Sequence, residues 1–321
     1  MLCLLNTNND IYFNLALEEY LLRQKQDDFS IVWSSGRSVV VGKHQNTMAE
    51  INYAWLRENS IPVARRLTGG GTVYHGPGNL NFTFIRNSEP GRLVDFKSFV
   101  YPVISYLETL GLKAEAGRRH DILLNGLKIS GNAEHVYRNR TLHHGTLLFD
   151  ADLDELSMSL HTMQGRYKDR AVQSVRSQVT NIRDHLSEPM SFLLFKRGLY
   201  DFLVRNYRNT RSYSLTTDEE EQVKELKVAK YATHEWIFGY SPAFELNTEF
   251  FFMKEQYGIH LEVVKGVIQA CRIRSDSGTY GESIGEALNG KEYNYESVSL
   301  ALSEIDDLPD SLISVLLEAI F

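Results

Sequence analysis

The residues best suited to chemistry lie in one short stretch. Arg65 and Arg66 lead into three successive glycines, Gly69–Gly71, and alternating apolar residues resume at Leu80, so the glycines interrupt a sheet. Glycine accepts positive φ and lets a ligand approach the main chain, and arginine offers paired donors to a carboxylate or phosphate. The stretch predicts a site for an acidic ligand. The alternative is a glycine-rich surface turn beside solvated arginines.

A second candidate stretch is Asp121–Ser130, in which Asn125-Gly126 separates two apolar runs. Asn-Gly is a strong signal for a two-residue hairpin turn, which here would pair Asp121 with Ser130. Strand side chains alternate, so Asp121 and Lys128 would share one face, on diagonal positions about 7–8 Å apart. The two charged side chains can then contact one ligand from two directions. The alternative is a loose ion pair on an exposed face.

A third stretch, Thr141–Phe149, reads as a strand that opens on His143 and His144. Neither a cysteine nor an acidic residue accompanies the histidines at metal-ligand spacing, so a zinc site is not expected. Because side chains alternate along a strand, at most one of the two histidines can face a ligand.

These groups suit the activation of a carboxylic acid. The common templates for phosphate loops, dinucleotide fingerprints, zinc proteases and serine hydrolases are missing from the sequence. A lysine such as Lys128 can stabilise charge that develops when a carboxylate reacts with ATP. Asp121 is the natural ligand for Mg²⁺, because hard cations prefer carboxylate oxygens.

Periodicity predicts the elements that carry these groups. Asp10–Gln26 has the pattern of an amphipathic helix, with Glu18 and Glu19 opposite its apolar side. Other helices are expected over residues 96–110, 152–161, 191–207 and 217–229, and strands over Phe29–Trp33 and Ser38–Val41. In the last of these helices Thr217 and Glu220 stand in capping-box register. After Asn247 we expect two strands around a Lys265-Gly266 turn, a short helical piece and one final helix.

Length and composition bound the protein class. At 321 residues the chain exceeds the usual size of one hydrophobic core, so two domains are expected, over residues 1–246 and 247–321. A net charge of −7 argues against nucleic-acid binding. The apolar N-terminus is too short for a signal peptide or membrane span, and only Cys3 and Cys271 are present, so we expect a cytoplasmic protein without a membrane partner.

The motifs together resemble a known family. The runs are Arg-Arg-x-x-Gly-Gly-Gly-x-Val-x-His from Arg65, Asn-Gly-x-Lys-Ile-Ser-Gly from Asn125, and His-His-Gly-Thr-Leu-Leu from His143. In this order they resemble the lipoate-protein ligases, relatives of the biotin ligases. The resemblance implies an α/β (α+β) fold: a large catalytic domain of mixed, mostly antiparallel sheets flanked by helices, and a small α/β accessory domain at the C-terminus.

The resemblance also implies an activity. Lipoate and ATP, with Mg²⁺, would give lipoyl-AMP, and the lipoyl group would then pass to a specific lysine of a carrier protein. The implied carriers are the lipoyl domains of 2-oxoacid dehydrogenase complexes and the glycine-cleavage H protein.

The roles implied for single residues follow the family's motifs. Lys128 matches the catalytic lysine that contacts the lipoyl carboxylate and the adenylate, and Asp121 the magnesium ligand. Arg66 would reach the acid group or a phosphate. Lipoate binding is implied for Arg66, Gly69, Gly70, Gly71, Thr72, His75, His144 and Gly145. Binding of ATP or the adenylate is implied for Arg65, Tyr74, Asn79, Lys128, Ser174, Arg176 and Val179.

Two departures from the family pattern leave an alternative open. Gly76-Pro77-Gly78 replaces the usual Asp and resembles octanoyltransferases, and His120 replaces the usual Asn. The alternative is a lipoyl or octanoyl transferase that uses a pre-activated or carrier-bound donor. Octanoyltransferases work through a cysteine, however, and we expect Cys3 and Cys271 to be buried. A non-catalytic lipoyl-domain-binding protein is a third hypothesis, but it would not need an inward-facing lysine.

Overall fold

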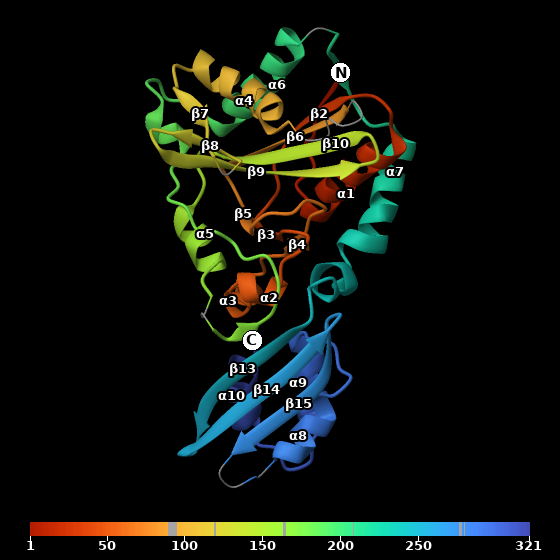
Figure 1. The fold of residues 1–321 in the computed structure, drawn as a ribbon, viewed down its shortest axis with the longest axis vertical. Helices are drawn as coiled ribbons and strands as arrows, with labels where there is room; N and C mark the ends of the chain where they lie inside the picture. The colour runs from red at the N-terminus through yellow and green to blue at the C-terminus, as the bar shows by residue number, and fades with distance from the viewer. Residues whose placement is uncertain (89–94, 119, 163–164, 208, 276–277, 279) are drawn as a thin grey trace. The chain divides into compact units, whose positions relative to one another are not determined.

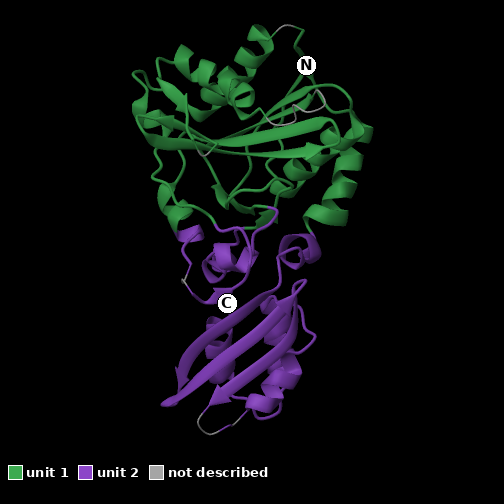
Figure 2. Cartoon of the chain, in the orientation of Figure 1, with its two compact units in different colours: residues 1–42, 62–157, 174–232 green, residues 43–61, 158–173, 233–321 purple. Residues whose placement is uncertain are grey.

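The computed structural model describes residues 1–321 apart from 89–94, 119, 163–164, 208, 276–277 and 279. Its internal contacts divide the chain into two compact units (Figure 2). Unit 1 comprises residues 1–42, 62–157 and 174–232, and unit 2 comprises residues 43–61, 158–173 and 233–321. Unit 1 therefore contains all the residues that the sequence analysis assigns to the site.

Unit 1 is built on an eight-stranded sheet with the order β12-β1-β2-β6-β10-β9-β8-β7. The pairs β12–β1 and β1–β2 are parallel and the others antiparallel, as expected for a mixed, mostly antiparallel sheet. The strands are β1 (Leu2–Leu5), β2 (Phe29–Trp33), β6 (Asn79–Asn87), β7 (Ala114–Ala116), β8 (Asp121–Leu124), β9 (Leu127–Tyr137), β10 (Arg140–Leu148) and β12 (Arg211–Tyr213).

The two faces of this sheet differ in character. Helices α4 (Phe96–Thr109) and α6 (Phe192–Asn206) cover one face, and α1 (Ile11–Gln24) lies against the other (Figure 1). The main hydrophobic core, which includes Phe82, Phe84 and Phe149, lies between the sheet and α4 and α6. Burial of such aromatic side chains is a main source of stability for a domain of this kind. We therefore expect the chemistry on the opposite face of the sheet.

A small sheet of order β4-β3-β5 supports the glycine stretch in unit 1. Strand β3 (Ser38–Val41) pairs in parallel with β4 (Val63–Arg65) and antiparallel with β5 (Val73–His75). The three glycines lie between β4 and β5, so they interrupt a sheet as predicted.

The remaining helices of unit 1 correct one detail of the sequence analysis. The capping box of α7 (Thr217–Leu226) is formed by Thr216 and Glu219, one residue earlier than we predicted. The Thr216 side chain accepts from the Glu219 amide, and the Glu219 carboxylate accepts from the Thr216 amide. Three consecutive glutamates make both registers possible in the sequence. A short 3₁₀ helix spans Ile182–His185, α7 continues as a π-helical turn over Lys227–Tyr231, and α5 (Leu153–Ser159) crosses the division between the units.

Unit 2 contains a four-stranded sheet of order β11-β13-β14-β15. Its elements are α2 (Thr47–Glu50), α3 (Tyr53–Glu58), β11 (Tyr167–Lys168), a π-helical turn at Glu235–Gly239, β13 (Phe244–Phe252), β14 (Glu255–Val264), β15 (Val267–Ser275), α8 (Gly281–Leu288), α9 (Tyr295–Ser303) and α10 (Asp310–Ile320). The turn at Lys265-Gly266 is present as predicted, with positive φ at both residues. The predicted single final helix is wrong, because α9 and α10 are separate helices. Leu308 and Pro309 precede α10, and proline suits the start of a helix.

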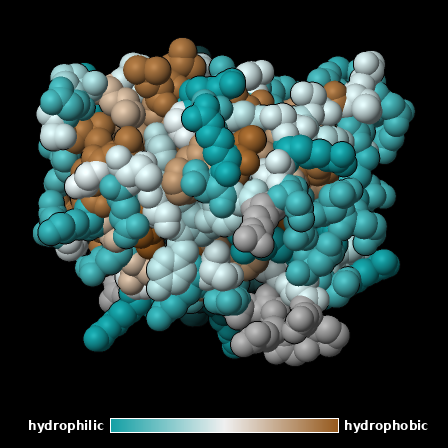
Figure 3. Space-filling model, turned by 90° about the horizontal axis from the view of Figure 1, so that it is seen from above, coloured by the Kyte–Doolittle hydropathy of each residue, from teal (hydrophilic) through white to brown (hydrophobic). Residues whose placement is uncertain are grey.

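In the described part of the chain no helix is both long and apolar enough to cross a bilayer. The face in Figure 3 is mostly hydrophilic, with small hydrophobic patches between polar side chains. Exposed apolar residues on α4 and α6 include Tyr101, Leu193 and Leu194. Scattered exposure of this kind is ordinary for a globular protein.

Candidate functional site

The candidate site is built on the polar face of the large sheet. On β10, His143 points into the core, where its ring stacks on Phe99 with the ring centroids 5.0 Å apart. His144 points the other way and bonds to Glu18 of α1. The sequence prediction that at most one of the two histidines faces a ligand agrees with this arrangement.

The glycine loop is held in shape from inside by Arg66. Its Nη2 donates to the carbonyl oxygens of Gly69 and Gly71, at 2.7 Å each, and its Nη1 donates to that of Val40 at 3.0 Å. Its Nε donates to Thr68 Oγ1 at 2.9 Å. These bonds use four of the five N–H donors of a guanidinium. In this structure Arg66 shapes the loop, and its predicted contact with the acid group or a phosphate of a ligand stays a prediction.

Gly70 explains why the loop needs glycine. Its φ is +86°, in the region that side chains rarely adopt, and a Cβ atom would lie 3.2 Å from Arg66 Nη2. Burial lowers the pKa of Arg66 to about 10, and the nearby Glu18 opposes this shift to a smaller extent. The guanidinium therefore stays charged at neutral pH. The loop therefore places bare main chain over a buried positive charge.

Three residues predicted to bind the nucleotide lie deeper than expected. Arg65 is fully buried and donates to the Gly42 carbonyl at 3.0 Å. The Tyr74 hydroxyl donates to Glu155, and Asn79 is fully buried with its amide on Asn81 Oδ1. In this arrangement the three side chains brace strands, and their predicted contact with a nucleotide stays a prediction.

The hairpin has the predicted turn but a different register. Asn125 and Gly126 have φ of 52° and 79°, and Leu123 pairs with Lys128 as expected. A β-bulge then shifts the register, so that Asp121 pairs with Gly131 and not with Ser130. The extra residue is Ile129, which is fully buried. The predicted pairing of Asp121 with Ser130 is wrong for this reason.

The bulge also changes how Lys128 lies relative to Asp121. A Cβ atom on Gly131 would lie 3.2 Å from Lys128 Nζ, so the lysine chain extends over Gly131. Gly131 is the partner of Asp121 across the strands. The ammonium of Lys128 is therefore carried toward the strand position that holds Asp121, on the same face as predicted.

The segment from Ser174 to Thr180 connects the predicted parts. The Lys128 amide donates to the Gln178 carbonyl at 3.0 Å, and the Thr180 amide donates to the Lys128 carbonyl at 3.1 Å. Val179 forms the corresponding parallel bridge with Lys128. At the other end, Ser174 Oγ accepts from the Thr72 amide at 2.9 Å. The segment thus joins the central lysine to the glycine loop, while Arg176 is exposed.

This junction gives a test of the loop's packing. A Cβ atom on Gly71 would lie 2.9 Å from Ser174 Oγ and 3.2 Å from Ser174 Cα, so Gly71→Ala must displace Ser174. We expect the amides of Lys128 and Thr180 to exchange with deuterium about tenfold faster in this variant. Gly69→Ala is the matched control, since a Cβ atom there meets nothing within 4 Å. Equal exchange rates in the two variants would contradict the proposed junction.

His75 and Gly145 complete the predicted lipoate-binding set. His75 is 4% exposed, and its Nδ1 lies 3.2 Å from Ser35 Oγ. Burial, and to a smaller extent the charge of Arg66, lowers the pKa of His75 to about 3, so the ring is neutral. At Gly145 a Cβ atom would collide with the Phe82 ring and with Asn132 Oδ1. The absence of a side chain at Gly145 therefore serves packing on the core side of the sheet, and its predicted contact with lipoate stays a prediction.

Glu18 is a buried residue of the site that sequence analysis missed. It is 3% exposed and Glu19 is 4% exposed, so neither faces solvent as the helical pattern predicted. Helical periodicity could not reveal this, because the partners of Glu18 are Thr83 and His144, far along the chain. A signal existed in the polar residues Asn79, Asn81 and Thr83, which stand at alternate positions of β6.

The donor set at Asp121 fits a magnesium ion. Asp121 is 8% exposed, and its Oδ1 is buried without a hydrogen-bond partner among the described residues. The same part of the chain holds no cluster of three or more histidine, cysteine or acidic residues that could ligate a metal. Mg²⁺ commonly takes one or two protein carboxylates and completes its shell with water and substrate phosphates. The unpaired Oδ1 of Asp121 would supply one such carboxylate ligand.

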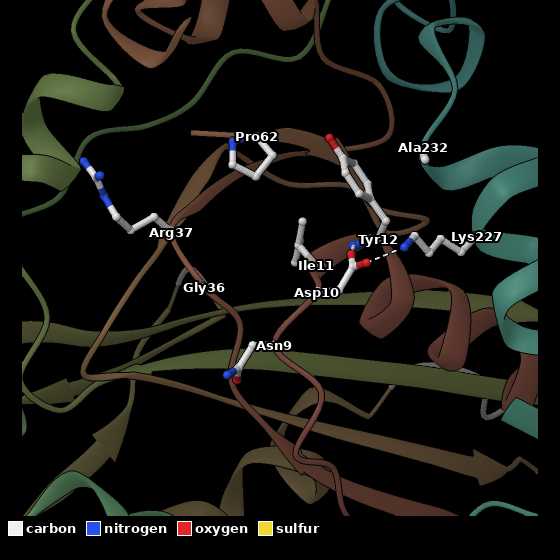
Figure 4. A pocket seen from close by; sticks show the side chains of 9 residues that line it. All are labelled: Asn9, Asp10, Ile11, Tyr12, Gly36, Arg37, Pro62, Lys227 and Ala232. Atoms are coloured by element: carbon white, nitrogen blue, oxygen red, sulfur yellow. Dashed lines mark hydrogen bonds and ion pairs between the residues drawn. The ribbon is translucent and has the colours of Figure 1, made fainter. Parts of the chain in front are cut away.

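A separate cavity in unit 1, of about 450 Å³, does not contain the predicted residues (Figure 4). It is lined by Asn9, Asp10, Ile11, Tyr12, Gly36, Arg37, Pro62, Lys227 and Ala232. Its charged groups are already paired: Asp10 with Lys227, and Arg37 with Glu155. Lys128, Asp121 and the glycine loop lie elsewhere and do not line this cavity.

Two family models and a similar protein indicate the family of this chain. The family described as lipoyl protein ligase A/B catalytic domain matches residues 10–203, and the bacterial lipoate protein ligase C-terminus matches residues 241–320. The lipoate-protein ligase LplJ of Bacillus subtilis is 36% identical over 313 residues, which cover 95% of this chain and 95% of the relative.

Solved structures point the same way. A bi-partite lipoate protein ligase of Thermoplasma acidophilum, studied with its E2 lipoyl domain, is 27% identical with a TM-score of 0.65, over 74% of this chain and 96% of that chain. A lipoate-protein ligase A bound with ATP is 28% identical with a TM-score of 0.61, over 74% of this chain and 98% of that chain. The predicted family, fold class and enzyme type are confirmed: the chain belongs to the lipoate-protein ligase family.

Proposed function

We propose that this chain activates lipoate with ATP and joins the lipoyl group to a lysine of a carrier protein. The observation that carries the proposal is the convergence on one sheet face of Lys128, the orphaned oxygen of Asp121 and the glycine loop. The ATP in one solved relative and the E2 lipoyl domain of another support the substrates. An acyl adenylate, lipoyl-AMP, is the intermediate that such groups suit.

In the first step, a lipoate carboxylate oxygen attacks the α-phosphorus of ATP and pyrophosphate leaves with the electron pair of the broken P–O bond. The ammonium of Lys128 is placed to stabilise negative charge on the acid and phosphate oxygens in the transition state. The main chain of Gly69 to Gly71 gives the acyl chain a surface without side chains. Asp121 would hold Mg²⁺, which when bound neutralises charge on the phosphate oxygens.

In the second step, the ε-amine of the carrier lysine attacks the acyl carbonyl carbon. The amide bond forms, the carbonyl–AMP bond breaks, AMP leaves, and the amine loses a proton. Lys128 would remain beside the mixed-anhydride oxygens and stabilise the charge on them. The segment from Ser174 to Thr180, bonded to the main chain of Lys128, would cover the adenylate during both steps.

The thiols give no support to a transferase that works through a cysteine. Burial is the main cause that raises the pKa of Cys3 to about 11 and that of Cys271 to about 12. Both are buried, and thiols in such settings are poor nucleophiles. A lipoyl or octanoyl transferase that uses a pre-activated or carrier-bound acyl donor remains the second candidate, because Gly76-Pro77-Gly78 and His120 depart from the ligase pattern.

One assay separates the two candidates. The full chain is incubated with lipoate, Mg-ATP and an apo lipoyl domain, and released pyrophosphate and the mass of the domain are measured. Modification of the domain with ATP as the energy source supports the ligase. If the domain is modified with synthetic lipoyl-AMP but not with ATP, only transfer is retained. If neither donor works, the proposal is wrong.

Three further points belong to the proposal. The carriers would be lipoyl domains of 2-oxoacid dehydrogenase complexes and the glycine-cleavage H protein, and the assay can compare the two directly.

The division into a catalytic part, 1–246, and an accessory part, 247–321, is supported by the separate family match over residues 241–320. The compact units, however, also group residues 43–61 and 158–173 with the C-terminal part. Location in the cytoplasm stays a prediction.

A further inference from the structure

Glu18 is a buried carboxylate that the mechanism above does not use. It lies in the middle of α1 and is 3% exposed. Its neighbour Glu19 is neutralised by Arg23 and Lys230, at 2.7 Å each. Among the described residues, the hydrogen-bond partners of Glu18 are instead a hydroxyl and an imidazole. Thr83 Oγ1 donates to it at 2.5 Å, and His144 Nδ1 lies 3.0 Å from both carboxylate oxygens.

A chain of hydrogen bonds leads from Glu18 to the glycine loop. His144 Nε2 lies 2.8 Å from Thr68 Oγ1, and Arg66 Nε donates to the same oxygen at 2.9 Å. Arg66 Nη2 in turn holds the carbonyl oxygens of Gly69 and Gly71. Four buried residues thus connect α1 to the loop.

The donor and acceptor properties of these four side chains determine which group donates in each hydrogen bond. Arginine can only donate, and an ionised carboxylate can only accept. Arg66 therefore donates to Thr68. When Glu18 accepts from His144 Nδ1 and the ring is neutral, His144 Nε2 is left as the acceptor for the Thr68 hydroxyl. Every hydrogen in the chain has an acceptor when His144 carries its proton on Nδ1. The partner of one ring nitrogen fixes the tautomer of a histidine in this way.

We propose that Glu18 is a positioning residue for the ligase reaction: by fixing the tautomer of His144, it directs Thr68 and Arg66 to hold the glycine loop in the shape that binds the acyl substrate. The proposal rests on the proposed function, because it names what shapes the lipoate site. Glu18 acts through His144 and does not itself touch the reacting atoms. It adds a role for Thr68 and Glu18, which no sequence motif indicated.

Glu18→Gln is the informative variant, since it keeps the shape and removes the charge. A glutamine amide can donate to His144 Nδ1 and so favours the Nε2–H tautomer, as in other carboxylate-to-amide changes beside a histidine. His144 and Arg66 would then both donate to Thr68 Oγ1, and the Thr68 hydrogen would lose its acceptor. We expect the KM for lipoate to rise about tenfold or more, with the KM for ATP changed less than about twofold.

Three controls keep the test sharp. Glu19→Gln, at the adjacent buried carboxylate, should lower the melting temperature and leave the KM for lipoate unchanged. Thr68→Val should raise the KM for lipoate like Glu18→Gln. The double variant should be no worse than either single one, because residues of one chain are not additive. Multiplied effects would show that Glu18 acts independently of Thr68 and would overturn the proposal.

A spectroscopic measurement tests the inference without activity. The ¹⁵N shifts of the His144 ring should report the Nδ1–H tautomer in the wild-type chain and the Nε2–H tautomer in Glu18→Gln. An Nε2–H ring in the wild type would overturn the proposal. Failure of the two proposals can be told apart. An inactive wild-type chain contradicts the proposed function. If the wild-type chain is active and Glu18→Gln leaves the KM for lipoate unchanged, this inference alone is contradicted.

Discussion

Lys128→Ala is expected to lower the rate of lipoate-dependent pyrophosphate release by about 10²–10³-fold, because it removes a preorganised cation from the developing charge. The fold should survive. The main-chain N–H and C=O of Lys128 hold the segment at Gln178 and Thr180, and alanine keeps both groups. The measurement is the initial rate of pyrophosphate release at saturating lipoate and ATP.

Lys113→Ala provides the control for loss of a lysine. Lys113 is exposed in the same unit, between α4 and β7, and its removal should leave the rate unchanged. A Lys128→Ala protein that keeps more than about a tenth of the wild-type rate would show that another group stabilises the charge. The melting temperatures of the three proteins should agree within a few degrees.

Asp121→Asn is expected to raise the Mg²⁺ concentration needed for half-maximal adenylation by at least about tenfold, because a carboxylate ligand of the ion is lost. Transfer from synthetic lipoyl-AMP should be nearly unaffected, since that step needs no pyrophosphate to leave. Both half-reactions are measured on the same protein preparation over a Mg²⁺ titration.

Glu115→Gln is the matched control for Asp121→Asn. Glu115 lies on the neighbouring strand β7, opposite Leu123, and its side chain is exposed. An unchanged Mg²⁺ requirement in Asp121→Asn would remove Asp121 from the metal site. Equal losses in adenylation and transfer would point to a damaged hairpin instead of a lost ligand.

Local patterns were enough to predict much of the framework. The Asn125-Gly126 turn, the interruption of a sheet at the three glycines and the opposite directions of His143 and His144 follow from turn chemistry and strand alternation. These rules act over a few residues, so one sequence contains the information. The motif runs then indicated the family because they occur in order along most of the chain.

What the sequence could not reveal depends on contacts between distant segments. The bulge at Ile129 changes the partner of Asp121, yet an inserted residue leaves no mark on an alternating pattern. Glu18 was predicted to face solvent and Arg66 to bind a ligand, but both residues are buried by partners on other strands. Burial of charge needs tertiary partners, and periodicity within one element does not identify these.

The most direct test of the account is a crystal structure with lipoate and a non-hydrolysable ATP analogue. The account predicts Lys128 Nζ within hydrogen-bond distance of a carboxylate oxygen of lipoate, with the acyl chain in van der Waals contact with the main chain of Gly69 to Gly71. Lipoate bound away from the glycine loop, or with its carboxylate out of reach of Lys128, would contradict it.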